Sequence, residues 1–296
     1  MNNLTKRILV AVIAIPIVLF IVLEKPVAFF ALAIILSGLT VYEYYGLARI
    51  KGYSPQISLG VFFSILITLS FGKFRLQSLL APLKISVISP QFEMLGVLII
   101  LSSVIILSLE LFRGLPNPLE QTAITMFGAI YIGVGMGSLF GIHEYFTLKN
   151  TGLEHLDMLP SGLFIVVLLV SIWVGDSAAY FVGKAIGKHK VAERISPGKT
   201  WEGSIACFVF TIGVWVAAPL VLYIFSLLPL HHAIAIGAII GIAGQFGDFG
   251  KSLLKREVGV KDSSNLIPGH GGVLDRLDSI IFSAPMVLLY LWIANV

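Results

Sequence analysis

Long apolar runs separated by short polar segments dominate this chain of 296 residues. A bilayer core about 30 Å thick is crossed by roughly 20 helical residues, and most of the runs approach that length. The pattern therefore predicts an all-α fold: a polytopic integral membrane protein with about nine transmembrane helices. The expected spans are residues 8–23, 27–47, 57–71, 92–112, 122–145, 161–183, 205–227, 233–250 and 273–293.

The composition agrees with a protein that lies in a lipid bilayer. Hydrophobic residues make up 57% of the chain and charged residues only 12%, whereas soluble domains are roughly a quarter charged. The net charge of +4 does not indicate nucleic-acid binding, because the basic residues lie in short loops beside apolar runs. Cys207 is the only cysteine, so neither a disulfide within the chain nor a cysteine-based zinc site is expected.

The basic residues also predict an orientation in the membrane. With nine spans, fifteen of the twenty lysines and arginines fall on the side of the N-terminus. Basic residues are enriched in cytoplasmic loops, so we expect a cytoplasmic N-terminus, an external C-terminus and a location in a bacterial inner (plasma) membrane. Residues 73–89, between the third and fourth spans, are expected to form a partly ordered loop or an interfacial helix.

The chemistry is unevenly distributed between two regions. Residues 1–150 hold the first five spans, and residues 151–296 hold the last four with their cytoplasmic loops, which we expect to be catalytic. In the first region Glu43 and Glu110 lie near span ends. Each belongs either to an interfacial aromatic belt or to a lipid-facing functional group.

A stripe of small residues marks the fifth span. Gly133, Gly137 and Gly141 recur every four residues, which is typical of close packing between membrane helices. The pattern does not say whether the contact lies within one chain or across a homodimer.

The candidate site is the charged segment 252–278, which lies between two apolar runs. Asp248, Ser252 and Lys255 have the spacing i, i+4, i+7. They share one face if the preceding run continues as a helix. A charged cytoplasmic loop is the simpler interpretation of such a segment.

A second pair of acids follows the glycine-rich part of this segment. Gly271 and Gly272 end any helix, and a new helix is expected to begin near residue 273. Asp275 and Asp278 then lie together in its first turns. Carboxylates on two helices, with lysines and arginines between them, fit a metal-bound nucleoside triphosphate, since oxygen ligands suit Mg²⁺ and cations bind phosphates.

Two further elements precede this segment. Asp176 lies in the sixth span within DSAAYFVG and is either functional or a structural acid paired with a lysine. The loop SPGKTWEG begins at Ser196 and contains Lys199. It is not a P-loop, because that motif requires a glycine where Glu193 stands.

Together, SLLKREVGVKDSSNLIPGHGGVLDRLD, DSAAYFVG and SPGKTWEG resemble the signature of the phosphatidate cytidylyltransferases, also called CDP-diacylglycerol synthases. The chain departs from that pattern at Lys251, because many members carry an acid directly before the motif serine. If that acid assists metal binding in relatives, it cannot do so here.

The resemblance implies a nucleotidyltransferase that condenses CTP with phosphatidic acid, using Mg²⁺. A second ion is left open, because two-metal sites clamp both the attacking and the leaving oxygens. Asp248 and Asp275, followed by Asp278, are the expected metal ligands. His270 would either bind a phosphate or cap its loop. The expected catalytic residues are Asp275, Asp248, Lys255 and Arg276, and the expected substrate-binding residues are Lys199, Ser196, Asp176, Ser252, Arg256, Lys261, Asp262, His270, Gly271 and Gly272.

Two other functions remain open at this stage. A CTP-dependent enzyme that acts on another lipid phosphate would carry the same motifs. A secondary transporter would also hold intramembrane carboxylates, but it should show two similar halves with polar residues near the midplane. Here the polar residues gather at the ends of the last four spans.

Overall fold

The computed structural model describes residues 3–72, 77, 91–149, 161–222, 228–267, 269 and 271–296. These parts of the chain are helical and contain no strand, as the apolar runs predict. The predicted segment 73–89 and residue His270 lie outside the description, apart from residue 77. The helices are α1 (Asn3–Glu24), α2 (Pro26–Ile50), α3 (Ile57–Ser70), α5 (Gln91–Glu110), α6 (Pro118–Lys149), α7 (Ser161–Ile186), α8 (Trp201–Val221), α9 (Leu230–Glu257) and α10 (Leu274–Ala294).

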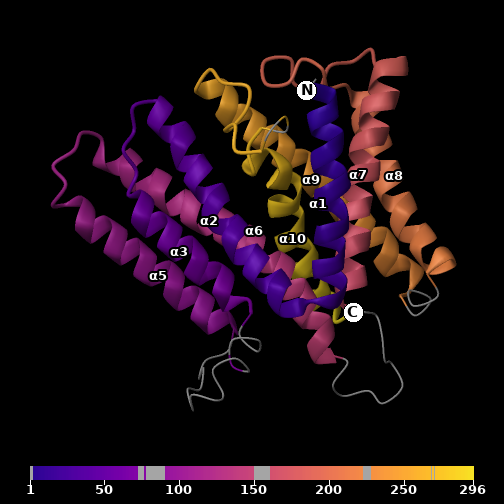
Figure 1. The fold of residues 1–296 in the computed structure, drawn as a ribbon, viewed down its shortest axis with the longest axis horizontal. Coiled ribbons are helices and arrows are strands. Elements are labelled where there is room, and N and C mark those ends of the chain that lie inside the picture. The colour runs from indigo at the N-terminus through magenta and orange to yellow at the C-terminus, as the bar shows by residue number, and fades with distance from the viewer. Residues whose placement is uncertain are drawn as a thin grey trace.

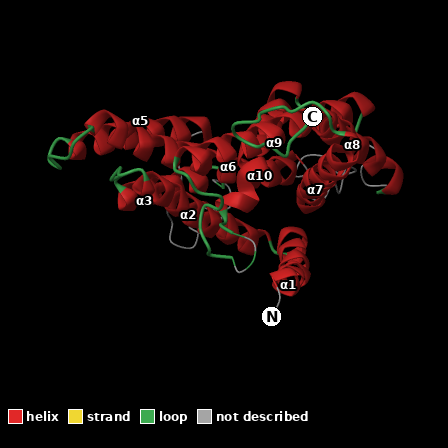
Figure 2. Ribbon diagram, turned by 90° about the horizontal axis from the view of Figure 1, so that it is seen from above, coloured by secondary structure: helices red, strands yellow, loops and turns green. Residues whose placement is uncertain are grey.

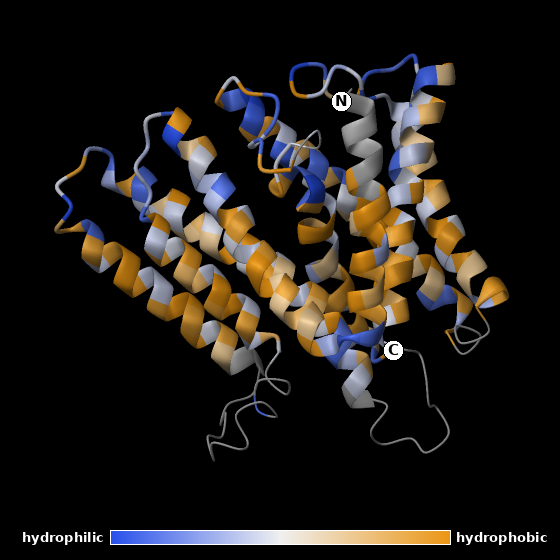
Figure 3. Ribbon diagram, in the orientation of Figure 1, coloured by the Kyte–Doolittle hydropathy of each residue, from blue (hydrophilic) through white to orange (hydrophobic). Residues whose placement is uncertain are grey.

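Six of the described helices are long and apolar enough to cross a membrane: α2, α6, α7, α8, α9 and α10. Shorter apolar helices cover Val12–Glu24, Ile57–Ser70 and Met94–Glu110. Figure 3 shows the hydrophobic residues along the helices, while hydrophilic residues gather on the connecting loops and helix ends. The all-helical membrane architecture is thereby confirmed, and the count of nine spans stays a prediction.

The helices form two groups on either side of α6. In Figures 1 and 2, α2, α3 and α5 lie on one side, and α7, α8, α9 and α10 lie on the other. Helix α6 packs against α2 and α3 as well as α10, so it joins the groups. Helix α1 lies at the edge of the second group and contacts α7 and α2 (Figure 2).

The glycines of α6 make contacts within the chain. A side chain at Gly133 would come within 2.9 Å of the Ser64 carbonyl oxygen on α3. One at Gly141 would meet Leu288 of α10 at 2.8 Å, and Gly137 faces Phe71. The stripe therefore lets α6 approach its neighbours in the same subunit.

Glu110 is buried, so the lipid-facing interpretation suggested by the sequence is wrong for it. Its carboxylate accepts hydrogen bonds from Gln56 Nε2 at 2.6 Å and from the Arg113 guanidinium at 2.9 Å. These partners lie before α3 and just after α5, far along the chain from the charged segment. Glu110 thus stabilises the first group of helices.

Three helix boundaries decide where the polar residues lie. Helix α8 begins four residues earlier than predicted, because the Thr200 hydroxyl caps it by accepting the Gly203 N–H at 3.2 Å. Helix α9 continues past residue 250 to Glu257, as the spacing of Asp248 and Lys255 predicts. Helix α10 begins at Leu274, one residue after the predicted start.

Candidate active site

Six ionic side chains meet where α9, α10 and the loop before α8 come together. We call them the ion cluster. Three are carboxylates and three are ammonium groups, so their formal charges balance. The ion cluster consists of Asp248, Lys251 and Lys255 from α9, Asp275 and Asp278 from α10, and Lys199 from the loop.

Close packing of two helices brings these groups together. A side chain at Gly247 would collide with the Asp278 carbonyl oxygen, so only glycine lets α9 come this near to α10. Lys251 then reaches across: its Nζ lies 3.1 Å from Asp248 Oδ1, 3.7 Å from Asp275 Oδ1, and in contact with Asp278 Oδ2. The predicted proximity of the three carboxylates is therefore present, with a lysine between them.

Asp275 is fixed by four donors. Its Oδ1 accepts the Lys255 ammonium at 2.6 Å. Its Oδ2 accepts the Ser263 N–H at 2.8 Å, the Ser263 hydroxyl at 3.0 Å and the Gly272 N–H at 3.2 Å. Backbone donors cannot move independently of the loop, so this carboxylate has one well-defined orientation.

Glu43 of α2 holds the start of α10, which corrects the lipid-facing interpretation drawn from the sequence. The residue is only 5% exposed, so its side chain does not face lipid. Its Oε1 accepts the Val273 N–H at 3.0 Å and its Oε2 the Leu274 N–H at 2.8 Å. The first N–H groups of a helix have no partner within the helix, and a carboxylate there also complements the helix dipole.

The serines after α9 link Glu43 to the ion cluster. Ser264 donates its hydroxyl to Glu43 Oε1 at 2.6 Å, and the Ser263 hydroxyl lies 3.1 Å from Glu43 Oε2 as well as beside Asp275. Glycine is required at 272, because a side chain there would overlap Glu43 and Ser263. Gly271 adopts φ +79°, a conformation that favours glycine.

The loop before α8 is folded back on itself and presents Lys199. Its two arms are paired by bonds from the Val191 N–H to the Lys199 carbonyl at 3.2 Å and from the Trp201 N–H to the His189 carbonyl at 2.8 Å. From this position the Lys199 ammonium contacts Asp248 Oδ2. Arg256 ties the loop to α9 by donating its Nε–H to the Ile195 carbonyl at 3.2 Å.

The structure brings together five of the predicted residues: Asp248, Asp275, Asp278, Lys199 and Lys255. Asp176 of α7 is near enough to Asp248 and Lys199 to interact with them electrostatically.

The other predicted residues have different environments. Arg256 bonds to backbone carbonyl oxygens, and Ser196 makes a turn within the loop through its N–H and carbonyl. Lys261, Asp262 and Arg276 are exposed, while Ser252 is partly buried on α9. His270 is not among the described residues.

Sequence reasoning did not assign Glu43 to the site and gave Lys251 no role. An acid within an apolar run was the only signal for Glu43, and nothing local identifies a partner 230 residues away.

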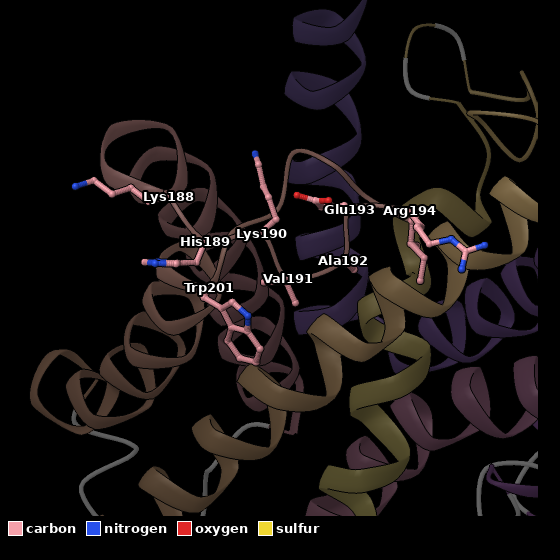
Figure 4. Close-up of a pocket in the computed structure, with 9 residues that line it drawn as sticks. Lys188, His189, Lys190, Val191, Ala192, Glu193, Arg194 and Trp201 are labelled. Atoms are coloured by element: carbon pink, nitrogen blue, oxygen red, sulfur yellow. The ribbon is translucent and has the colours of Figure 1, made fainter.

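One hollow lies in the loop before α8 rather than at the carboxylates. It has a volume of about 890 Å³, and its lining runs from Lys188 to Ile195 with Trp201, without any member of the ion cluster. Figure 4 shows Lys188, Lys190 and Arg194 pointing in different directions, so they do not converge on one phosphate. We therefore place the candidate site at the ion cluster.

An apolar groove adjoins the ion cluster. Its volume is about 520 Å³, and Ile195, Phe208 and Phe246 are among the residues that line it from the loop, α8 and α9. Phe249 also lines it, and the Lys199 ammonium lies 4.2 Å from the centre of that ring. A charged group and an apolar groove therefore meet at one point.

The fit of the carboxylates to a metal ion is limited by the partners that they already have. Among the described residues, no group of three or more histidines, cysteines or acids is arranged to hold one. Asp248 is 29% exposed, and its Oδ2 is paired with Lys199, whose side chain is also partly exposed, so this oxygen can exchange its partner for a cation. Oδ2 of Asp275 is held by backbone donors, and Asp278 Oδ1 accepts the Ser279 N–H at 2.8 Å. Of the three carboxylates, Asp248 is therefore the one best placed to offer an oxygen to a divalent cation.

Comparison with known proteins covers almost the whole chain. The sequence profile described as the Cytidylyltransferase family matches residues 5–294. A protein named phosphatidate cytidylyltransferase from Pseudomonas aeruginosa is 33% identical over 99% of this chain and 98% of its own length. The one from Bacillus subtilis is 31% identical over 98% of both chains, and the one from Haemophilus influenzae is 42% identical over 45% of this chain and 48% of its own. The similarity thus includes the N-terminal helices, which carry no signature motif.

Proposed function

The chain belongs to the cytidylyltransferase family, and on this premise we propose that it is a CTP:phosphatidate cytidylyltransferase of a bacterial inner membrane. It condenses CTP with phosphatidic acid and releases CDP-diacylglycerol and pyrophosphate. The observation that carries the proposal is the ion cluster beside an apolar groove, because the substrates are a polyanionic nucleotide and an anionic lipid.

The reaction requires charge neutralisation and positioning rather than a general base. An oxygen of the lipid phosphate, already anionic near neutral pH, forms a bond to the α-phosphorus of CTP. The bond between the α-phosphorus and its bridging oxygen breaks, and pyrophosphate leaves with the electron pair. Phosphoryl transfer of this kind depends on alignment and on stabilising the developing charge.

The lysines of the ion cluster are the groups that meet phosphate oxygens. In the described structure Lys199 and Lys255 each contact a carboxylate, and both have side chains long enough to turn toward a ligand. An anionic substrate competes with Asp248 and Asp275 for these ammonium groups. As the lysines move to phosphate, the carboxylate oxygens become available to a cation.

Mg²⁺ bound with the nucleotide would be held by the Asp248 oxygen that Lys199 contacts, and would supply additional neutralisation of the phosphate charge. Asp275 is oriented by Ser263 and Gly272, so it keeps its place when Lys255 turns to a phosphate.

The apolar groove suits an acyl chain of phosphatidic acid. It is lined almost entirely by apolar surface and lies at Lys199. A lipid chain placed there puts its phosphate beside the ion cluster, while the nucleotide approaches from the loop side. This arrangement supports a lipid substrate that enters from the side of the bundle.

We propose nine spans with the N-terminus and the active site in the cytoplasm and the C-terminus outside. The start of α1 and the loop before α8 lie at the same end of the bundle in Figure 1, and the C-terminus lies toward the other end. The excess of basic residues on the side of the N-terminus supports this orientation. A homodimer stays a prediction.

The substrate assignment is tested with purified protein in detergent, Mg²⁺ and labelled CTP. Phosphatidate, a polyprenyl phosphate and an archaeal-type ether phosphatidate are offered separately and then in competition. Formation of CDP-lipid with phosphatidate at much the highest kcat/KM supports the proposal. Preferential use of either other lipid phosphate would instead assign the enzyme to a different lipid pathway.

A further inference from the structure

Lys251 lies at the centre of the ion cluster. Its ammonium is 3.1 Å from Asp248 Oδ1, 3.7 Å from Asp275 Oδ1 and in contact with Asp278 Oδ2. It also donates to the Asp275 carbonyl oxygen at 3.3 Å. The side chain is only 9% exposed. An ammonium surrounded by oxygens from two helices stands where a bound cation would stand.

The charges of the ion cluster explain how a lysine can be stable at a buried position. Without Lys251, three carboxylates would face two ammonium groups, leaving one uncompensated negative charge between α9 and α10. Burying unpaired carboxylates is costly, so the position requires a cation. Lys251 supplies that cation covalently, at the position where the chain departs from the acid expected in the signature.

We propose that Lys251 is a tethered cation that takes the place of a protein-held metal ion between α9 and α10. The chain therefore binds a single divalent cation, and binds it together with the nucleotide. This inference rests on the proposed function, since it concerns how that site neutralises phosphate charge. The physical reason is repulsion: a divalent ion among Asp248, Asp275 and Asp278 would lie within a few ångströms of the ammonium.

A substitution that removes the charge should open the position to a metal. Lys251→Gln keeps most of the side-chain length and leaves the ion cluster with one net negative charge. Lys251→Glu leaves two. We expect both variants to bind Mn²⁺ in the absence of nucleotide at least about tenfold more tightly than the unmodified protein does, with Lys251→Glu the tighter.

The experiment titrates Mn²⁺ into detergent-purified protein without nucleotide and follows free Mn²⁺ by electron paramagnetic resonance. Lys51→Gln is the matched control, because it removes a lysine whose ion pair with Glu257 is exposed and outside the ion cluster. That variant should bind Mn²⁺ as the unmodified protein does. Lys251→Gln combined with Asp275→Asn should lose the gained binding, which locates the new site at the ion cluster.

A second measurement counts the Mn²⁺ bound to the unmodified protein, and this count does not depend on any variant folding. Mn²⁺ is titrated in the presence of a saturating non-hydrolysable CTP analogue. One Mn²⁺ per chain in the ternary complex supports the proposal. Two Mn²⁺ per chain would overturn it. The proposal would also be overturned if the unmodified protein bound Mn²⁺ without nucleotide and the Asp275→Asn substitution abolished that binding.

The result is separable from the proposed function. Mn²⁺ binding without nucleotide reports the cation position whatever reaction follows. Failure to form CDP-diacylglycerol would count against the function, while the Mn²⁺ titrations would still decide the role of Lys251.

Discussion

Glu43 offers a direct test of whether the N-terminal helices hold the active site in place. Each of its carboxylate oxygens accepts one backbone N–H from the start of α10 and one serine hydroxyl. Glu43→Gln replaces one oxygen by an amide group that cannot accept. It therefore loses one backbone bond and one hydroxyl bond, while Glu43→Ala loses all four.

The expected loss in the free energy of unfolding follows from the backbone N–H donors that these substitutions leave without a partner. Val273 and Leu274 are buried, so their N–H groups cannot turn to water. A buried donor without a partner costs about 1 to 3 kcal/mol. We expect Glu43→Gln to lower the free energy of unfolding by about 1.5 to 3 kcal/mol, and Glu43→Ala by about 3 to 5 kcal/mol.

The assay combines thermal unfolding in detergent with CTP kinetics measured well below the unfolding midpoint. The start of α10 carries Asp275, and Ser263 bridges that residue to Glu43. Glu43→Gln should therefore lower kcat at least about tenfold in protein that is still folded.

Glu110→Gln is the matched control, because Glu110 is equally buried but has partners only in the first group of helices. It should lose stability and keep its kcat. If folded Glu43→Gln retained the kcat of the unmodified protein, Glu43 would be a purely structural residue and the positioning argument would be refuted.

Three further predictions follow from the site and the orientation. Lys199→Ala should lose about 1.5 to 3 kcal/mol of charge-assisted bonding, seen as a lower kcat/KM for CTP, whereas unchanged CTP kinetics would make it an ordinary loop lysine. Asp248→Asn and Asp275→Asn should each abolish Mg²⁺-dependent turnover, and the double variant should be hardly less active than either single variant. If the fold losses in activity of the two single variants multiplied in the double variant, a shared role would be excluded. A cysteine at Lys261 in a Cys207→Ser background should resist an impermeant thiol reagent added outside intact cells, and labelling from outside would contradict the nine-span orientation.

The parts of the site that are local in sequence could be predicted from it. Helical spacing placed Asp248 and Lys255 on one face of a helix, and the glycine-rich break placed Asp275 and Asp278 at the start of a new helix. The structure confirms both, because i, i+3 and i, i+4 relations depend only on helix geometry.

Contacts between distant segments could not be predicted in the same way. Periodicity assigns Gly141 and Gly247 to helix faces but does not name the neighbour that each face meets. Glu43 and the start of α10 are joined by tertiary packing alone, and one buried acid gives no information about its partner. Lys251 was recognised as a departure from a pattern, but its place between three carboxylates depends on the approach of α10.

The most direct test of the central claim follows the fate of two phosphates of CTP. Purified protein is given phosphatidate, Mg²⁺ and CTP labelled at either the α- or the γ-phosphate, with Asp248→Asn measured in parallel. The account predicts that α-label enters the lipid phase and γ-label appears as pyrophosphate in equal amounts, and that the variant produces neither. Transfer of γ-label to the lipid, or α-label in the lipid without pyrophosphate, would contradict nucleotidyl transfer at the ion cluster.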